Sequence, residues 1–264
     1  NWGEILVDKE IQHSRLFIFS HKGDVKYKGI EGDVPTFKLL GHSVDDWPDY
    51  ESQFVGRDKE FNKLFDFAQP LFEGKSPGMA YVFGEAGMGK SRLMYELKNK
   101  LTADEGAQWY TCQSDQILKK PFNPFVYFLK NYFDQSPDAT ADDKKGSFES
   151  RLEQLEEELS NSSHKKSNGI LKELKRTSSV LAAQLGIYYI DSLWEQLDAQ
   201  GRYQNTIAAI INLLIAESIC TPIIVELEDG HWTDGNSSEL MQEFVKQMKN
   251  FPKPLILQLQ KKIL

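Results

Sequence analysis

The eight residues at positions 84–91, Gly-Glu-Ala-Gly-Met-Gly-Lys-Ser, constrain this chain more than any other segment. They match the pattern G-x-x-x-x-G-K-[ST] of a phosphate-binding loop at every required position. In such a loop Gly84 and Gly89 permit a tight turn that directs backbone N–H groups at a phosphate. Lys90 brings a positive charge to the β- and γ-phosphates, and the Ser91 hydroxyl is an oxygen ligand suited to Mg²⁺. The segment therefore predicts a nucleotide-binding site.

The segments on either side have the periodicity that such a loop requires. Residues 79–83 form a short apolar run typical of a buried parallel strand, and residues 91–100 have the pattern of a helix. The N-terminus of that helix adds its dipole to a phosphate site. A glycine-rich turn that binds no ligand is the alternative. On the nucleotide-binding interpretation, the expected contacts are Gly84, Glu85, Ala86, Gly87, Met88, Gly89, Lys90, Ser91 and Arg92.

A second acidic element follows much later, at residues 222–229. Pro-Ile-Ile-Val-Glu-Leu-Glu-Asp is an apolar strand pattern that ends in two carboxylates, as in a Walker B element. We expect Glu228 to hold Mg²⁺ together with Ser91, and Asp229 to polarise the attacking water. Glu226 lies inside the apolar run, so a register shifted by two residues stays open. An ordinary strand that ends in a polar turn is the alternative.

Three segments together resemble one family, the AAA-related signal-transduction ATPases with numerous domains. They are Phe-Val-Gly-Arg-Asp-Lys-Glu at residues 54–60, the loop at 84–91, and Leu-Glu-Asp-Gly-His-Trp-Thr-Asp at 227–234. The resemblance covers residues 54 to about 257, in the family's order and at plausible spacing.

That resemblance implies a fold and a set of ligands. The expected fold is α/β: a three-layer P-loop NTPase with a parallel sheet over residues 53–264, truncated at its C-terminus. ATP and Mg²⁺ are the implied ligands. In the family the first of the three segments packs against adenine and ribose, which implies that Val55, Gly56 and Arg57 line the base side of the nucleotide.

The first forty residues predict a separate small unit. Residues 3–7, 16–19 and 23–41 have the pattern of two or three short strands joined by glycine and aspartate turns. They resemble the C-terminal end of a class III adenylate/guanylate cyclase catalytic domain. The expectation is a partial α+β cyclase segment at 1–41 and a polar linker at 42–52, in a chain that is a fragment. The family's catalytic residues would lie upstream of this chain. An unrelated β-extension is the alternative.

Other patterns predict the elements between the two nucleotide motifs. The expected elements are a strand at 107–112, a helix at 121–133, a loose segment at 134–145, a charged helix with an apolar stripe at 148–159, a loop at 160–169, and helices at 171–185 and 206–220. Arg202 is either a phosphate sensor or a structural arginine, the latter being favoured. His231 fits a packed or capping residue better than a catalytic one.

Composition limits the class of protein. The net charge of −8 and the pI of about 5.3 argue against a nucleic-acid surface. The most apolar stretch, residues 206–220, is shorter than the roughly 20 residues of a membrane span, so no membrane partner is expected. Cys112 and Cys220 have no metal-ligand spacing and fit buried free thiols. A cytoplasmic location follows as an expectation.

The leading functional hypothesis is an ATP- and Mg²⁺-binding module whose slow hydrolysis acts as a regulatory switch on an attached cyclase. A nucleotide-stabilised scaffold for partner recognition is one alternative, and the ATPase module of a transcription regulator is another. Because class III cyclases generally work as dimers, the resemblance also implies a possible homodimer through the missing cyclase domain.

Overall fold

The computed structural model describes residues 5–7, 9, 17–29, 32–42, 54–85, 87–114, 120–251 and 254–261. They fall into two compact units, one made of residues 1–51 with the short segment 136–140 and the other of residues 52–135 and 141–264. Apart from residue 42, which ends a strand, the predicted linker lies outside the described residues.

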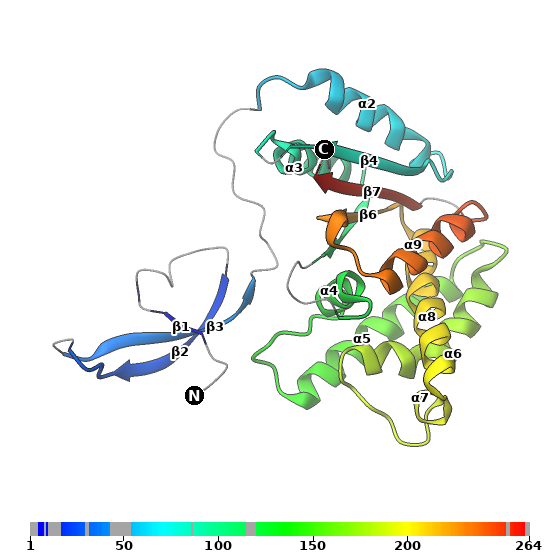
Figure 1. Ribbon diagram of the computed structural model, residues 1–264. Helices are drawn as coiled ribbons and strands as arrows, with labels where there is room; N and C mark the ends of the chain where they lie inside the picture. The colour runs from blue at the N-terminus through cyan, green and yellow to red at the C-terminus, as the bar shows by residue number, and fades with distance from the viewer. Residues whose placement is uncertain are drawn as a thin grey trace. The chain divides into compact units, whose positions relative to one another are not determined.

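The N-terminal unit contains a three-stranded antiparallel sheet (Figure 1). Its strands are β1 (Leu6–Val7), β2 (Phe17–Val25) and β3 (Val34–His42), in the order β1-β3-β2. The pairing of β2 with β3 shifts register between residues 18 and 19 and again between 21 and 23. Two or three short strands were predicted here, and three are present among the described residues. Among the described residues this unit shows no helix beyond an isolated helical residue at Lys9, so the α+β character of the segment stays a prediction.

The second unit is built on a four-stranded parallel sheet. Its strands are β4 (Gly78–Gly84), β5 (Gln108–Gln113), β6 (Ile223–Glu228) and β7 (Pro254–Lys261). The order is β4-β7-β6-β5, so the last strand of the chain lies between the loop-bearing strand and the acidic strand. The predicted α/β class with a parallel sheet is confirmed.

Helices cover this sheet and fill the long crossover between β5 and β6 (Figure 1). Their bounds are α2 (Asp58–Ala68), α3 (Lys90–Asn99), α4 (Asn123–Tyr132), α5 (Ala141–Ser160), α6 (Ser167–Gln184), α7 (Leu193–Gln196), α8 (Ala199–Cys220) and α9 (Gly235–Met248). Shorter helical turns are η1 (Gln69–Leu71), η2 (Lys100–Asp104) and η3 (Gly230–Trp232).

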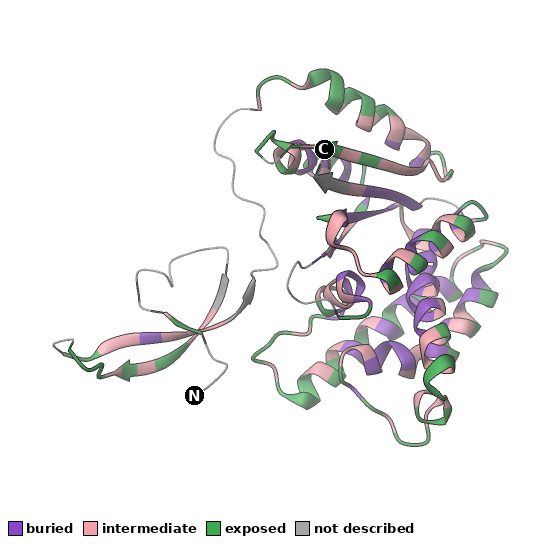
Figure 2. Cartoon of the chain, in the orientation of Figure 1, coloured by how far each residue is buried: buried purple, intermediate pink, exposed green. Residues whose placement is uncertain are grey.

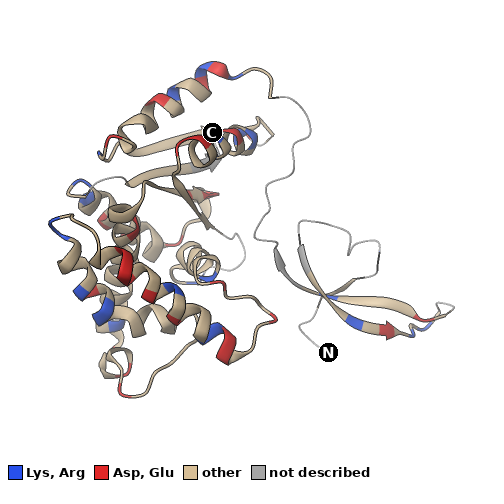
Figure 3. Cartoon of the chain, turned by 180° about the vertical axis from the view of Figure 1, so that it is seen from behind, with Lys and Arg blue, Asp and Glu red and all other residues tan. Residues whose placement is uncertain are grey.

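The alternation of side chains along β6 shows which of its residues face each helical layer. Ile223, Val225 and Leu227 of β6 join the large apolar cluster that includes residues of α8 and α9. Because successive side chains of a strand point to opposite faces, Glu226 and Glu228 face the other layer, which contains α3. Figure 2 shows buried residues in β6, in the first half of β7 and along the helices of the crossover, most densely in α8. Figure 3 shows charged residues mainly on the helices. The unit therefore has the three layers that were predicted.

Two predicted boundaries in the crossover are corrected by the structure. The segment 134–145 was expected to be loose, but α5 begins at Ala141. The loop expected at 160–169 is shorter, since α6 begins at Ser167. In both cases acidic or small polar residues at a helix start were taken for loop residues, although such residues are favoured in the first helical turn. The stripe Phe148, Leu152, Leu155 and Leu159 is buried, as expected of a packing face.

A buried carboxylate joins the helices of the crossover to the sheet. Glu217 of α8 accepts hydrogen bonds from the hydroxyls of Tyr110 in β5, at 2.7 Å, and of Tyr132 in α4. Arg151 of α5 pairs with the same carboxylate at 2.7 Å and lies 4.6 Å from the centre of the Tyr132 ring. Burial, and next the negative charge of Glu217, raise the pKa of both tyrosine hydroxyls, which stay neutral donors. One acid thus holds four elements together.

Replacing the cation of this cluster tests its contribution to stability. We expect Arg151→Met to lower the free energy of unfolding by about 2–3 kcal/mol, because the Glu217 carboxylate would stay buried without its cation. The loss falls below that of a fully buried pair, since the Arg151 side chain is 26% exposed. Urea denaturation measures it. Arg176→Met, which removes an exposed pair with Glu173 on α6, is the control and should cost well under 1 kcal/mol. Equal losses would contradict a special role for Arg151.

The structure also bears on the two cysteines and on the question of a membrane span. Cys112 is a buried free thiol and Cys220 a partly buried one. Burial raises the pKa of Cys112 well above its ordinary value. Within the described ranges, none of the helices combines the length and the apolar character needed to cross a membrane.

Candidate functional site

The loop at residues 84–91 connects β4 to α3, as its sequence predicted. Gly87 and Gly89 have φ values of 78° and 79°, which place both in the left-handed region that favours glycine. Gly84 was expected to share the tight turn with Gly89, but it ends β4 without a positive φ, and Gly87 has that role instead. Ala86 lies outside the described residues. The loop thus has the backbone form of an anion-binding turn at a helix N-terminus.

Lys90, the first residue of α3, turns its side chain back over the loop. Its Nζ donates to the carbonyl oxygens of Gly84, at 3.0 Å, and Glu85, at 2.9 Å. The ammonium group is therefore positioned above the loop, where a phosphate held by the backbone N–H groups would be within its reach. Ser91 follows on the same first turn of α3 and is exposed.

The acidic strand lies across the sheet from the loop. Leu227 of β6 is level with Gln258 of β7, and Gly84 of β4 is level with Lys261 of β7. Glu228 therefore ends its strand at the same edge of the sheet as the loop, with one strand between. Neighbouring strands lie about 4.8 Å apart, so β6 is about 10 Å from β4. The loop and Glu228 thus lie on either side of the end of β7.

Asp229 has an unusual backbone conformation. Its φ of 48° and ψ of 40° lie in the left-handed region, and it forms the N-cap of the turn η3. Aspartate tolerates this region better than most residues, but the conformation still costs about 1 kcal/mol. Gly230 follows, and a Cβ added there would lie 2.5 Å from Nε2 of Gln258. The strained turn fixes the direction in which Asp229 leaves the strand.

Glu226 lies two residues before Glu228 on the same face of β6 and is fully buried. Its Oε2 accepts a 2.7 Å hydrogen bond from the Trp109 indole N–H. Burial, and next the charge of Glu228, raise the pKa of Glu226 to about 8. Glu226 is thus enclosed, whereas Glu228 ends the strand. The assignment of Glu228 as the metal ligand stays a prediction.

The segment before α2 approaches the loop through Arg57. Its Nε lies 3.9 Å from the position of a Cβ on Gly89, and its Nη1 lies 3.5 Å from Glu60 Oε1. Arg57 also has a left-handed backbone, with a φ of 59°, and Val55 is 82% exposed. The structure therefore brings Arg57 to the phosphate loop and leaves the Val55 side chain open to solvent.

A cavity of ≈ 430 Å³ lies beside the loop, between α2 and β4. Leu64 and Phe67 of α2 and Val82 of β4 contribute apolar walls, and Arg57 and Lys90 contribute positive charge. This combination fits a ligand with a flat apolar part and an anionic part. The α2 residues were not among the predicted site residues, although their i, i+3 spacing, typical of an inward-facing helical stripe, would have found them.

Comparison with known proteins decides the family. Residues 53–257 match the family model described as AAA ATPase domain. The chain belongs to this family. A curated relative, an uncharacterized protein of Rhizobium meliloti (strain 1021), is 24% identical over 261 residues, which cover 96% of this chain and 23% of the relative. The chain thus spans about a quarter of the length of the relative it matches. These comparisons support a nucleotide-binding ATPase module and provide no support for a cyclase segment.

Several residues of the AAA ATPase domain have structural partners. Arg92 pairs with Glu96 at 2.5 Å, so its expected contact with nucleotide stays a prediction. Arg202 donates to the Trp194 carbonyl at 3.0 Å and lies 4.7 Å from the centre of its ring, which favours the structural alternative. Asp234 is the N-cap of α9.

His231 fits the packed role expected of it. Its ring lies 4.9 Å from that of Trp232, and its Nδ1 is buried without a hydrogen-bond partner among the described residues.

The donor set of the AAA ATPase domain fits Mg²⁺ that arrives with a nucleotide. Within the described residues there is no group of three or more His, Cys, Asp or Glu side chains that could hold a metal ion. Mg²⁺ commonly binds through one or two protein oxygens together with substrate phosphates and water. The Ser91 hydroxyl and the Glu228 carboxylate supply such oxygens at the edge of the sheet.

Proposed function

We propose that this chain binds ATP with Mg²⁺ in the loop at 84–91 and hydrolyses it slowly to ADP and phosphate. The observation that carries this proposal is the strand order, which brings the loop and the two carboxylates to one edge of the sheet with β7 between them. The family membership and the left-handed glycines of the loop give independent support.

In this proposal the nucleotide phosphates lie on the backbone N–H groups of residues 87–91. Lys90 leaves the carbonyls of Gly84 and Glu85 and binds the β- and γ-phosphates, because a charged phosphate oxygen is the stronger acceptor. Arg57 adds a second positive charge beside Gly89. The base occupies the cavity beside α2. Arg92, Val55 and Gly56 complete the nucleotide set that the sequence suggests.

In this proposal Asp229 activates the water that attacks the nucleotide. A carboxylate at this position accepts a proton from, or orients, the water that attacks the γ-phosphorus, and the bond from that phosphorus to the bridging oxygen breaks. Mg²⁺, when bound, would supply positive charge to offset the charge that develops on the phosphate oxygens. Glu228 and Ser91 would hold the ion in place.

Binding of labelled ATP tests the proposal directly. We expect Lys90→Ala to weaken ATP binding about ten- to hundredfold, because a charge-assisted phosphate contact is lost while the glycines of the loop remain. Lys100→Ala, just past the end of α3, is the matched control, since Lys100 pairs with Asp104 away from the loop. Unchanged affinity in Lys90→Ala would overturn the site. ATP binding without turnover would instead favour the nucleotide-stabilised scaffold.

We also propose that the ATPase module regulates a signalling partner within a longer cyclase-type protein. The support is the sequence resemblance of residues 3–41 and the three strands found there. The upstream reading frame is the test: paired metal-binding aspartates of a cyclase core would support this role. A DNA-binding module at either end of the gene product would favour a transcription regulator instead.

A further inference from the structure

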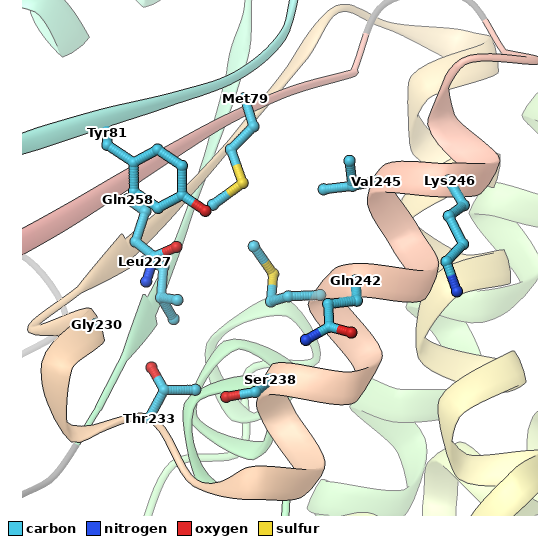
Figure 4. A pocket seen from close by; sticks show the side chains of 11 residues that line it. Met79, Tyr81, Leu227, Gly230, Thr233, Ser238, Gln242, Val245, Lys246 and Gln258 are labelled. Atoms are coloured by element: carbon cyan, nitrogen blue, oxygen red, sulfur yellow. The ribbon is translucent and has the colours of Figure 1, made fainter.

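A second cavity lies on the sheet face opposite α3, away from the phosphate loop. Its volume is ≈ 510 Å³, within the range of small-molecule sites. The floor is a row of three residues at one level of three neighbouring strands, Tyr81 of β4, Gln258 of β7 and Leu227 of β6. One wall is α9. Figure 4 shows Tyr81 and Met79 on the sheet side and Gln242 and Val245 on the α9 side of the same space.

Three of the polar side chains that line this cavity are neutral and make no hydrogen bond to a described residue. They are the Tyr81 phenol and the carboxamides of Gln242 and Gln258. The part of the lining that the structure describes contains no carboxylate and one cation, Lys246, which pairs with Glu243. The remaining walls are apolar or thioether side chains, namely Met79, Leu227, Met241 and Val245.

We infer that this cavity is a second ligand site, for an uncharged planar ring with adjacent hydrogen-bond donor and acceptor groups, the chemistry of a nucleobase. A carboxamide presents a donor and an acceptor side by side and can bind such an edge with two hydrogen bonds. The Tyr81 ring and the sulfurs of Met79 and Met241 offer polarizable surfaces to the face of a flat ring. Among the described residues of the lining the one cation, Lys246, is mostly exposed and pairs with Glu243, so the described lining favours a neutral ligand over an anion.

The site adjoins the turn that follows Glu228 and Asp229 at the end of β6. Gln258 is in contact with Gly230, and Gly230 and Thr233 line the cavity directly after Asp229. Thr233 also bonds Ser114, at the end of β5, at 3.2 Å. A ligand that engages Gln258 therefore touches a segment whose backbone sets the direction of Asp229. The site is placed to act as an effector site for the proposed ATPase.

Binding of adenosine and inosine to the chain tests this inference. Neither nucleoside carries phosphate, and excess ADP with Mg²⁺ keeps the loop site filled. We expect saturable binding at millimolar or lower nucleoside, measured by saturation-transfer NMR. Gln242→Leu and Gln258→Leu should each weaken nucleoside binding about tenfold, because the polar edge of the bound nucleobase would lose its hydrogen bonds to the carboxamide. Gln242 is exposed on α9, so its variant keeps the fold even if the Gln258 variant does not.

The matched control is Gln247→Leu, on the same helix, whose carboxamide bonds Glu243 and does not line the cavity. It should bind the nucleosides as the wild type does. Three results would overturn the inference: no saturable binding of either nucleoside at millimolar concentration, binding that ADP displaces, and binding that neither cavity variant changes. None of these depends on whether the chain hydrolyses ATP.

Discussion

An Asp229→Asn protein is expected to bind ATP with Mg²⁺ nearly as the wild type does and to hydrolyse it at least about a hundredfold more slowly. An amide has the shape of the carboxylate but cannot take a proton from the attacking water. Asp229 also holds a left-handed backbone, which asparagine adopts as readily, so the turn at η3 should survive. Single-turnover hydrolysis of labelled ATP measures the rate, and equilibrium titration measures the affinity.

The companion variant Glu228→Gln distinguishes the two carboxylates. It should weaken Mg²⁺-dependent ATP binding, because a neutral amide oxygen is a poorer ligand for a hard cation. Binding measured without Mg²⁺ should change little in either variant. If both variants lose Mg²⁺ dependence equally, the assigned division between metal ligand and water-orienting residue is wrong. If Glu226→Gln alone loses it, the register of the acidic strand must move by two residues.

Glu226→Gln is expected to stabilise the chain at neutral and alkaline pH. The pKa of Glu226 is about 8 in the folded protein, against 4.5 for an unperturbed carboxyl group. Below the lower value both states bind the proton and pH has no effect. Between the two values only the folded state keeps it, so stability falls by about 1.4 kcal/mol for each pH unit. Over the whole interval the loss approaches about 5 kcal/mol, and it levels off above the folded pKa.

The glutamine side chain is neutral and can still accept the Trp109 hydrogen bond. The variant should therefore lack this decline and exceed the wild type by a few kcal/mol near pH 8. Urea denaturation of both proteins at several pH values between about 5 and 8.5 measures the difference. Glu60→Gln, an exposed change in α2, is the control and should leave the wild-type pH profile in place. Parallel profiles for the wild type and Glu226→Gln would show that the Glu226 carboxyl ionises normally in the fold.

Local sequence was sufficient for the loop and its immediate context. The left-handed region favours glycine, and the pattern identified one of the two left-handed glycines of the loop, Gly89; the other, Gly87, stands at a variable position where Gly84 was expected to have that role. The strand before the loop and the helix after it could be predicted because the apolar residues within each segment recur at the spacing of a strand or of a helix. The same holds for the apolar strand that ends at Glu228 and for the long helix before it. For the same reason the presence of short N-terminal strands could be predicted, although their number was left at two or three. These features depend on residues that are close together in the chain.

The arrangement of those pieces was decided only by the tertiary structure. Nothing local indicates that β7 inserts between β4 and β6, because strand neighbours are chosen by the packing of whole layers. Trp109 and Glu226 are 117 positions apart, so the burial of that carboxyl could not be inferred from its apolar neighbours. The approach of Arg57 to Gly89 and the two cavities likewise join segments distant in sequence. Sequence periodicity fixes which face of an element is buried, whereas the partner of that face follows from the fold.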